Sequence, residues 1–349
     1  MLMNLLDIPD YILEIIFNYH NWNNYIIHIL LIHTKISNYI LKINMYSTRL
    51  DRYNIIKKCM NIERIVMEYD LSDYISNIFY LKNLKYIFLY QLKYVEDFSA
   101  LYNLKNVEEL SLNFLKISDI GFLENYNKLH TLIIKNCYSI IDFSNIKYLN
   151  LYKLHIEDTD KIYTIDSINN NITILKLIKT ENIYDFNRLE HFTKLRSLNI
   201  NWSKGIYYKQ NNIDLLNFGN LKYLQKLILV GRKDIVDITH ISYLNNITSL
   251  DLSFTELNDL KCLIPLSNIK KLKLNNCDKL KDINDFKYFK SKDVMEYLAI
   301  KWLIVDDISS LLFLTNLKNL DIKWLKGISD NIYLKVINKI KNNGCIIRD

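Results

Sequence analysis

The chain has 349 residues, half of them apolar, and carries 45 lysine and arginine residues against 38 aspartate and glutamate residues. The resulting net charge of +7 is mild and spread along the chain, which is typical of a solvated basic surface and argues against nucleic-acid binding. Asparagine, isoleucine, lysine and tyrosine are abundant, and their AT-rich codons indicate a low-GC genome or that of a large DNA virus.

The five cysteines are odd in number, far apart and form no CxxC pair: Cys59, Cys137, Cys262, Cys277 and Cys345. This pattern fits a reducing compartment and argues against a disulfide framework or a zinc site. The longest apolar run, YIIHILLIH at residues 25–33, is far shorter than the roughly 20 residues of a membrane span. We therefore expect a soluble, cytoplasmic protein, in the host cytoplasm if the chain is viral, that makes no membrane contact.

Residues 1–50 are predicted to form a helical segment without a strand pattern. Apolar residues at helical spacing favour one helix after a turn at residues 7–10 and a second over residues 24–40. A secretion signal is not expected, because no basic region precedes the apolar part and Asp7, Asp10 and Glu14 interrupt it.

The start of this segment resembles an F-box, whose pattern is an apolar–proline pair followed by a helix of the L-L-x-x-I-F type. The matching residues are Ile8, Pro9, Ile12, Leu13, Ile16 and Phe17. The resemblance implies that these six residues dock on a Skp-family adaptor. His20 stands where a leucine is usual, and the second helix lacks the usual cysteine and basic–tryptophan ending. The alternative is a plain helical cap.

A nine-residue frame recurs twelve times from residue 62 onward. In residues 246–260 it reads Ile247-x-x-Leu250-x-Leu252-x-x-Thr255. The middle apolar residue of each copy stands at position 65, 87, 110, 132, 154, 175, 198, 227, 250, 272, 298 or 320. Alternating apolar residues predict a short strand, and copies stacked in parallel bury one continuous apolar core.

Two further columns of residues repeat with the frame. An aspartate follows most strands in an apolar-x-Asp-apolar step: Asp97, Asp119, Asp142, Asp185, Asp237, Asp259, Asp282 and Asp307. One carboxylate per repeat suggests a turn or N-cap role before a short helix rather than acid–base chemistry or calcium binding. Residue nine of the frame is small and polar in six copies and is predicted to turn inward and bond loop backbone: Cys137, Thr159, Thr180, Ser203, Thr255 and Cys277.

Over residues 55–330 the chain resembles a leucine-rich repeat protein of the class whose repeats are about 22 residues long. The resemblance implies an α/β solenoid with parallel strands on the concave face, short helical or irregular convex segments and a helical N-terminal cap. Two longer copies, containing residues 203–212 and 278–293, are predicted to carry surface insertions. Residues 331–349 are predicted to be a C-terminal cap, because Ile332, Val336 and Ile340 line one face of a helix.

Residue eight of the frame is predicted at the edge of the concave face and is aromatic in six copies: Tyr69, Phe114, Trp202, Phe254, Trp302 and Trp324. Trp302 and Trp324 follow Lys301 and Lys323 in two copies of the sequence IKWL and are predicted to stack in adjacent repeats. Exposed tryptophan near cations is typical of protein-binding hot spots, so these eight residues are the predicted binding surface. The alternative is that the rings pack on the loop behind them.

No catalytic motif is present, since the glycines are isolated and the histidines dispersed. We expect no enzyme, no cofactor and no metal. An F-box-like segment ahead of leucine-rich repeats resembles the substrate-recruiting subunit of an SCF-type cullin–RING ubiquitin ligase. This implies a Skp-family adaptor and cullin complex as partners and an unidentified protein substrate on the concave face. The alternative is a ubiquitin-independent interaction scaffold whose first helices only cap the solenoid.

Overall fold

The computed structural model describes residues 41–43, 63–68, 75–76, 78–92, 94–159, 161–180, 182–183, 186–201, 215–233 and 238–349. The chain divides into two compact units, Met1–Leu151 and Tyr152–Asp349. The predicted F-box-like helices, with all six adaptor-contact residues, lie outside the described residues.

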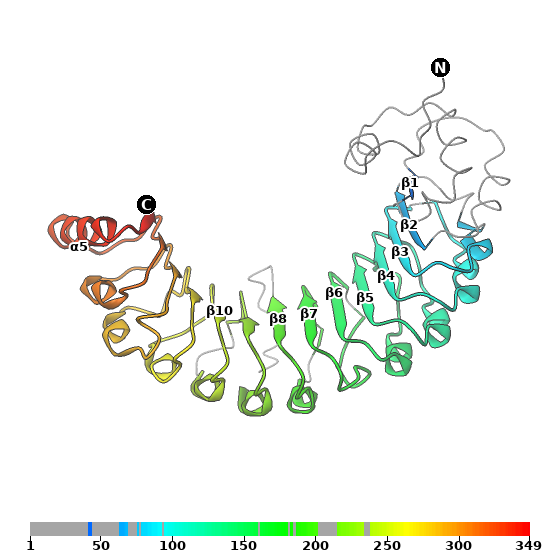
Figure 1. Ribbon diagram of the computed structural model, residues 1–349, viewed down its shortest axis with the longest axis horizontal. Coiled ribbons are helices and arrows are strands. Elements are labelled where there is room, and N and C mark those ends of the chain that lie inside the picture. The colour runs from blue at the N-terminus through cyan, green and yellow to red at the C-terminus, as the bar shows by residue number, and fades with distance from the viewer. Residues whose placement is uncertain are drawn as a thin grey trace, which may run out of the picture. The chain divides into compact units, whose positions relative to one another are not determined.

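The first unit is a row of parallel strands joined by 3₁₀ helices (Figure 1). Its strands pair in chain order: β1 (Leu41–Ile43), β2 (Arg64–Glu68), β3 (Tyr86–Tyr90), β4 (Glu109–Asn113) and β5 (Thr131–Lys135). The return segments contain η3 (Ile78–Tyr80), η4 (Ser99–Asn103), η5 (Gly121–Asn125) and η6 (Ser144–Tyr148). Ile65, Ile87, Leu110 and Leu132 pair in register, as the repeat spacing predicts.

The second unit repeats this plan. Its strands also pair in parallel and in chain order: β6 (Lys153–Glu157), β7 (Ile174–Ile178), β8 (Ser197–Asn201), β9 (Lys226–Ile228), β10 (Ser249–Asp251), β11 (Lys271–Lys273), β12 (Tyr297–Ala299), β13 (Asn319–Asp321) and β14 (Ile346–Arg348). The helices are η7 (Asn187–His191), η8 (Leu215–Asn220), η9 (Thr239–Tyr243), η10 (Lys261–Leu263), η11 (Asn284–Tyr288), η12 (Ser309–Phe313) and α5 (Asp330–Asn342). Within this unit the strands line the inner side of the curve, as predicted (Figure 1).

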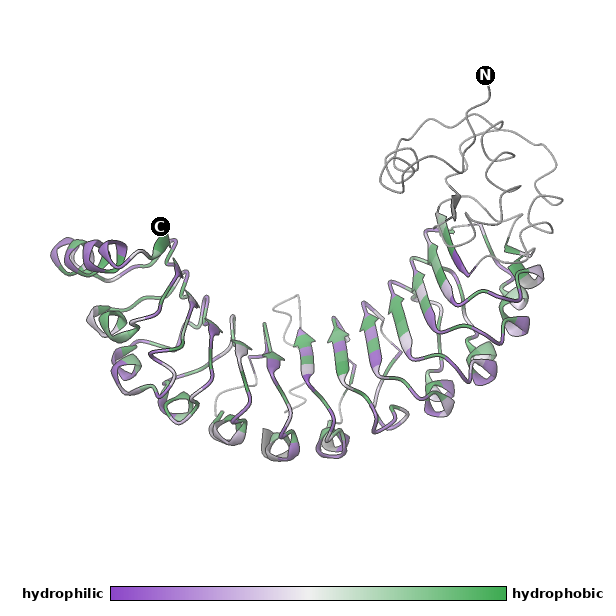
Figure 2. Ribbon diagram, viewed as in Figure 1, coloured by the Kyte–Doolittle hydropathy of each residue, from purple (hydrophilic) through white to green (hydrophobic). Residues whose placement is uncertain are grey.

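The core runs between the strands and the 3₁₀ helices of each unit. Residues one, four and six of the frame point into it, and Ile247, Leu250 and Leu252 are all buried. The intervening strand residues face outward, which Figure 2 shows as alternating apolar and polar bands along the strands. Each fully buried aliphatic side chain contributes about 1.5–3 kcal/mol relative to an exposed one. The stacked apolar core therefore stabilises repeats that are individually too short to fold.

The two longer copies leave the sheet register intact. Leu272 pairs with Leu298 across the copy that contains residues 278–293, and Leu198 pairs with Leu227 across residues 203–212. The prediction that the core is unbroken is confirmed, but residues 278–293 are not confined to the surface. Phe286 of this segment is fully buried, and its ring packs 5.0 Å from that of Phe289. Residues 203–212 themselves lie outside the described residues.

The ends of the sheet carry two strands that the repeat frame does not predict. The short β1 pairs with β2, so the expectation of no strand within residues 1–50 is wrong. At the other end, α5 confirms the predicted capping helix and buries Val336, Ile337 and Ile340. Gly344 follows with a φ of +84°, a conformation that suits glycine at a helix end, and the chain then returns to the sheet as β14. No helix in the described part of the chain is long and apolar enough to cross a membrane.

The repeated aspartates shape the turns into the 3₁₀ helices, as predicted. Six described carboxylates each accept the backbone N–H two residues further on, at 2.7–3.0 Å: those of Asp97, Asp119, Asp142, Asp259, Asp282 and Asp307. In five of them the donor is the first residue of an η helix of at least five residues, and in the sixth it is Lys261, which begins η10. The backbone hydrogen bond from Ser144 lowers the pKa of Asp142. Asp185 and Asp237 lie outside the described residues.

The small polar residues at frame position nine point inward in each copy that the structure describes. Thr255 donates to the Leu252 carbonyl at 2.8 Å, and the Cys277 thiol donates to the same carbonyl at 3.2 Å. The hydroxyls of Thr159 and Thr180 are buried but have no hydrogen-bond partner among the described residues. Burial raises the pKa of the Cys137 thiol to about 11, which keeps it protonated and unreactive near neutral pH.

The Asp142 turn predicts a specific pH dependence. Because the folded-state pKa lies below its ordinary value of 3.8, the ionised carboxylate stabilises the fold above that value, and the contribution disappears as pH falls through the folded pKa. Asp142→Asn keeps the acceptor oxygen but not the charge, whereas Asp142→Ala removes both. In urea unfolding at about pH 6, we expect wild type to be most stable, then Asn, then Ala. As pH falls below 3.8, the gap between wild type and Asn should narrow while Ala stays below both. A gap between wild type and Asn that does not change with pH would contradict the assignment.

Candidate functional site

Residue eight of the frame has a left-handed backbone in every copy that the structure describes. The φ angles lie between +52° and +77° at Gln91, Phe114, Asn136, Asp158, Lys179, Gly231, Phe254, Asn276, Trp302 and Trp324. In this conformation the backbone N–H donates to the carbonyl of residue seven in the next repeat, for example from Phe254 to Asn275 at 2.8 Å and from Trp302 to Lys323 at 3.1 Å. The left-handed residue thus lies beyond the strand and continues its hydrogen-bond ladder.

Aromatic side chains at this position are not explained by backbone preference. Glycine and asparagine adopt positive φ most easily, whereas a bulky side chain there is uncommon and strained. The chain places Asn136, Gly231 and Asn276 at equivalent positions, in keeping with that preference. Of the seven other positions, four carry an aromatic ring and three carry Gln91, Asp158 and Lys179. Backbone preference therefore does not account for the four rings.

Three of these rings form one exposed group, which we call the aromatic cluster: Phe254, Trp302 and Trp324. The indoles of Trp302 and Trp324 stack with centroids 4.7 Å apart and an interplanar angle of 6°, so the predicted stacking is observed. The ring centroids of Phe254 and Trp302 are 6.5 Å apart, although the repeat that carries Asn276 lies between their two repeats. The residues are 42%, 39% and 58% exposed respectively, so part of each side chain is open to solvent.

Two lysines lie over the cluster, and one of them also contacts a buried carboxylate. The ammonium of Lys301 is 5.5 Å from the Trp302 ring centroid, and that of Lys323 is 6.0 Å from the Trp324 ring centroid. Lys301 also pairs with the buried carboxylate of Asp321 at 3.5 Å. A cation in this position over an indole is attracted by about 0.5–1 kcal/mol at an exposed site. The cations therefore restrict the rings as well as adding charge.

A hydrogen-bonded chain beneath the cluster fixes its backbone. The Asn275 amide donates to the Ser253 hydroxyl at 3.2 Å, and the Asn275 side-chain oxygen accepts the Lys301 backbone N–H at 3.0 Å. Ser253 and Asn275 are buried. Ser253, Asn275 and Asp321 were not identified from the sequence. Ser253 and Asn275 are residue seven of the frame, which is polar in many copies, and that regularity is a signal that could have found them.

The predicted binding residues thus fall into three groups. Phe254, Lys301, Trp302, Lys323 and Trp324 lie together in the second unit. Phe114 belongs to the first unit, where it is exposed. Tyr69 and Trp202 lie outside the described residues.

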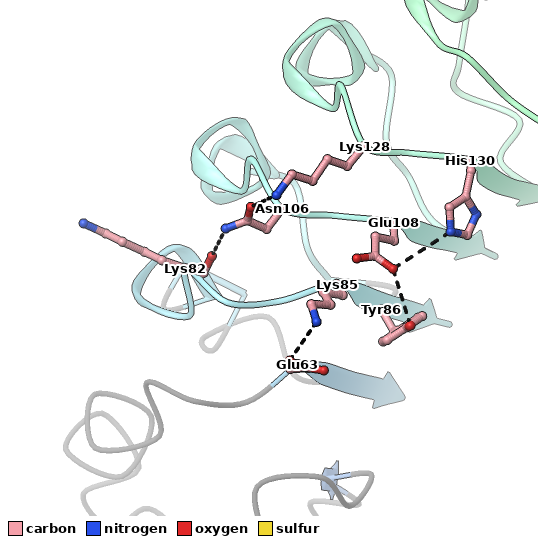
Figure 3. A network of polar contacts seen from close by, with 8 residues as sticks. All are labelled: Glu63, Lys82, Lys85, Tyr86, Asn106, Glu108, Lys128 and His130. Atoms are coloured by element: carbon pink, nitrogen blue, oxygen red, sulfur yellow. Dashed lines mark hydrogen bonds and ion pairs between the residues drawn. The ribbon is translucent and has the colours of Figure 1, made fainter.

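A second network of polar contacts lies in the first unit (Figure 3). Residue two of successive repeats alternates in charge: Lys85 pairs with Glu63 at 2.8 Å, and His130 lies 4.0 Å from Glu108. Exposed pairs of this kind contribute little to stability because water and salt screen them. They link neighbouring repeats, as does the hydrogen bond from Lys128 to Asn106 at 2.8 Å. Among the described residues, no group of three or more His, Cys, Asp or Glu side chains is placed to hold a metal ion.

The repeat length, the parallel register and the 3₁₀ return segments define a leucine-rich repeat solenoid of α/β type with one C-terminal helix. Neither the family models nor the curated protein sequences give a match. Among solved structures, an internalin (inlF) from Listeria monocytogenes is similar, with 20% identity and a TM-score of 0.55 over 93% of this chain and 88% of that one. A leucine-rich repeat protein of Leptospira interrogans has 16% identity and a TM-score of 0.48 over 90% and 95%. The likeness to the internalin confirms the predicted leucine-rich repeat solenoid, whereas the predicted helical N-terminal cap lies outside the described residues.

The left-handed backbone at Trp324 can be tested by comparing two substitutions. Trp324→Gly and Trp324→Ala both remove the ring, but only glycine is free of strain at a φ of +59°. We expect the glycine variant to be the more stable by about 1–2 kcal/mol in urea unfolding. At Lys271, in the extended strand β11, the order should reverse, because glycine there costs about 0.5–1 kcal/mol relative to alanine. Equal stabilities at position 324 would contradict the assignment.

Proposed function

We propose that this chain is a protein-binding leucine-rich repeat protein, not an enzyme, and that the aromatic cluster contacts its partner. The observation that supports this proposal is a group of three large rings, each about 40–60% exposed, at backbone positions where such residues are costly. Stacking, the overlying lysines and the ladder beneath hold the rings in place, so little side-chain entropy is lost on binding. Tryptophan in such a setting is typical of binding hot spots.

The cluster proposal predicts a separable loss of binding. The triple variant Phe254→Gly/Trp302→Gly/Trp324→Gly removes the rings and suits the local backbone, so it should fold. In affinity purification with quantitative mass spectrometry, we expect proteins retained by wild type to be depleted at least tenfold on this variant. Tyr243→Ala/Tyr288→Ala removes two exposed rings from the 3₁₀ side of the same unit and serves as the matched control. If the triple variant, shown to be folded by circular dichroism, retains the same proteins as wild type, the cluster is not the contact.

We further propose that the partner bound by the repeats is a substrate and that the chain is a recruiting subunit of an SCF-type cullin–RING ligase. The support is the sequence motif Ile8, Pro9, Ile12, Leu13, Ile16 and Phe17 ahead of the repeats. In this proposal the protein acts in the cytoplasm, that of a host cell if the chain is viral, and the motif binds the Skp-family adaptor. Ligation would take place on other subunits. The competing proposal is a scaffold that works without ubiquitin.

The adaptor proposal predicts that Pro9→Ala/Leu13→Asp abolishes co-purification of a Skp-family adaptor and cullin from eukaryotic cells. The reason is that an aspartate at position 13 would place a charge in an apolar contact, where burying it costs several kcal/mol. The triple aromatic variant should retain adaptor and cullin while losing the substrate. Absence of adaptor and cullin from the wild-type sample would leave the scaffold as the better proposal.

A further inference from the structure

The outward face of strands β10 to β13, beside the aromatic cluster, has an unequal distribution of charge. In the frame residues two to eight of these four repeats there are six lysines and three carboxylates. The lysines are Lys270, Lys271, Lys273, Lys301, Lys318 and Lys323, and the carboxylates are Asp251, Glu296 and Asp321. We call this surface the lysine face.

The carboxylates of the lysine face are screened from solvent by their partners. Lys273 pairs with Asp251 at 3.4 Å, and their side chains are 46% and 14% exposed. In the pair of Lys301 and Asp321 the values are 26% and 8%. Lys318 and Glu296, 3.3 Å apart, are 59% and 34% exposed. In every pair the lysine is the more exposed member, so an approaching molecule meets the cations first.

Three further lysines of this face add positive charge that no carboxylate offsets. Lys270, Lys271 and Lys323 make no ion pair within the part of the chain that the structure describes. Lys270 and Lys271 are exposed, and Lys323 lies over Trp324. A partner that covers both the cluster and this face must therefore supply negative charge, because burying unpaired ammonium groups is unfavourable.

We propose that the lysine face and the aromatic cluster together bind an acidic protein segment that carries at least one aromatic or large aliphatic side chain. This inference rests on the proposed protein-binding function and adds the chemistry of the partner. The apolar side chain packs on the exposed parts of Trp324, Trp302 and Phe254. The carboxylates of the segment pair with Lys270, Lys271 and Lys323.

Nucleic acid fits the same surface less well. Bases bind such platforms by stacking on aromatic faces, and the two indoles already stack on each other at 4.7 Å, which leaves no space for a base between them. The outward positions of β10 to β13 contain no arginine, the side chain whose planar fork matches a phosphate group best. We therefore argue for a protein segment and treat an oligonucleotide as an outcome of the test.

The test selects binders from a displayed library of short random peptides on the full chain. We compare wild type with three variants: the triple aromatic variant, Lys271→Glu/Lys323→Glu, and Lys279→Glu/Lys281→Glu. The last has the same change in net charge, but its two exposed lysines follow residue nine of the frame, outside the lysine face, and it is the matched control. Circular dichroism confirms that each variant is folded, and labelled oligo-dT and oligo-U of the same length as the peptides serve as competing probes.

The expected result is enrichment of acidic peptides containing an aromatic or large aliphatic residue. Their dissociation constants should rise at least tenfold with Lys271→Glu/Lys323→Glu, stay unchanged with Lys279→Glu/Lys281→Glu and rise with salt concentration. Neutral or basic peptides, or an equal loss with both charge variants, would overturn the inference. If binding is lost only in the triple aromatic variant, the protein-binding function stands and the acidic partner does not. If no variant changes the dissociation constants of the peptides, both the protein-binding function and the acidic partner are wrong. If an oligonucleotide binds more tightly than any peptide, the ligand is nucleic acid and not a protein segment.

Discussion

The interaction on which the rest of the structure depends is the parallel backbone ladder between equivalent residues of successive repeats. Each repeat returns its strand to the same register, as Leu250 and Leu272 show. The ladder extends past the end of strand β10 at Asp251 as far as Phe254, which donates to the Asn275 carbonyl. The residue that donates this last hydrogen bond has a left-handed backbone. As a result, residue eight has the same backbone conformation in every described repeat. A row of side chains at fixed spacing follows directly from backbone geometry.

The opposite side of each repeat is fixed by a different and more local interaction. A carboxylate such as Asp307 closes a turn onto the first residue of its 3₁₀ helix, at 2.7 Å. The local turn tolerates differences in repeat length, because the ladder on the strand side sets the register independently. This division explains why the copy that contains residues 278–293 keeps Leu272 opposite Leu298. The extra residues of this longer copy therefore lie outside the strands that form the ladder.

Periodic features could be predicted from the sequence because they recur at fixed spacing. The repeat register, the aspartate turns and helix α5 all have local patterns that repeat or alternate. Strand β14 could not be predicted, because Ile346–Arg348 has no frame and pairs only because Gly344 directs the chain back to the sheet. In the candidate site, the stacking of Trp302 on Trp324 follows from their spacing of one repeat. The contact of Phe254 across two repeats and the anchoring of Lys301 by Asp321 depend on side-chain directions that a sequence pattern does not contain.

The aromatic cluster combines an unfavourable backbone with favourable ring contacts, and the balance between them bears on its role. A bulky residue in the left-handed region costs of order 1–2 kcal/mol, whereas an aromatic pair returns about 0.5–1.5 kcal/mol beyond its buried area. The stacking and the overlying lysines offset this strain, while Trp302 and Trp324 stay 39% and 58% exposed. The proposed partner contact uses that exposed surface. Because the same ladder holds both the rings and the lysines of the adjacent strands, an apolar and a charged contact can be met by one rigid surface.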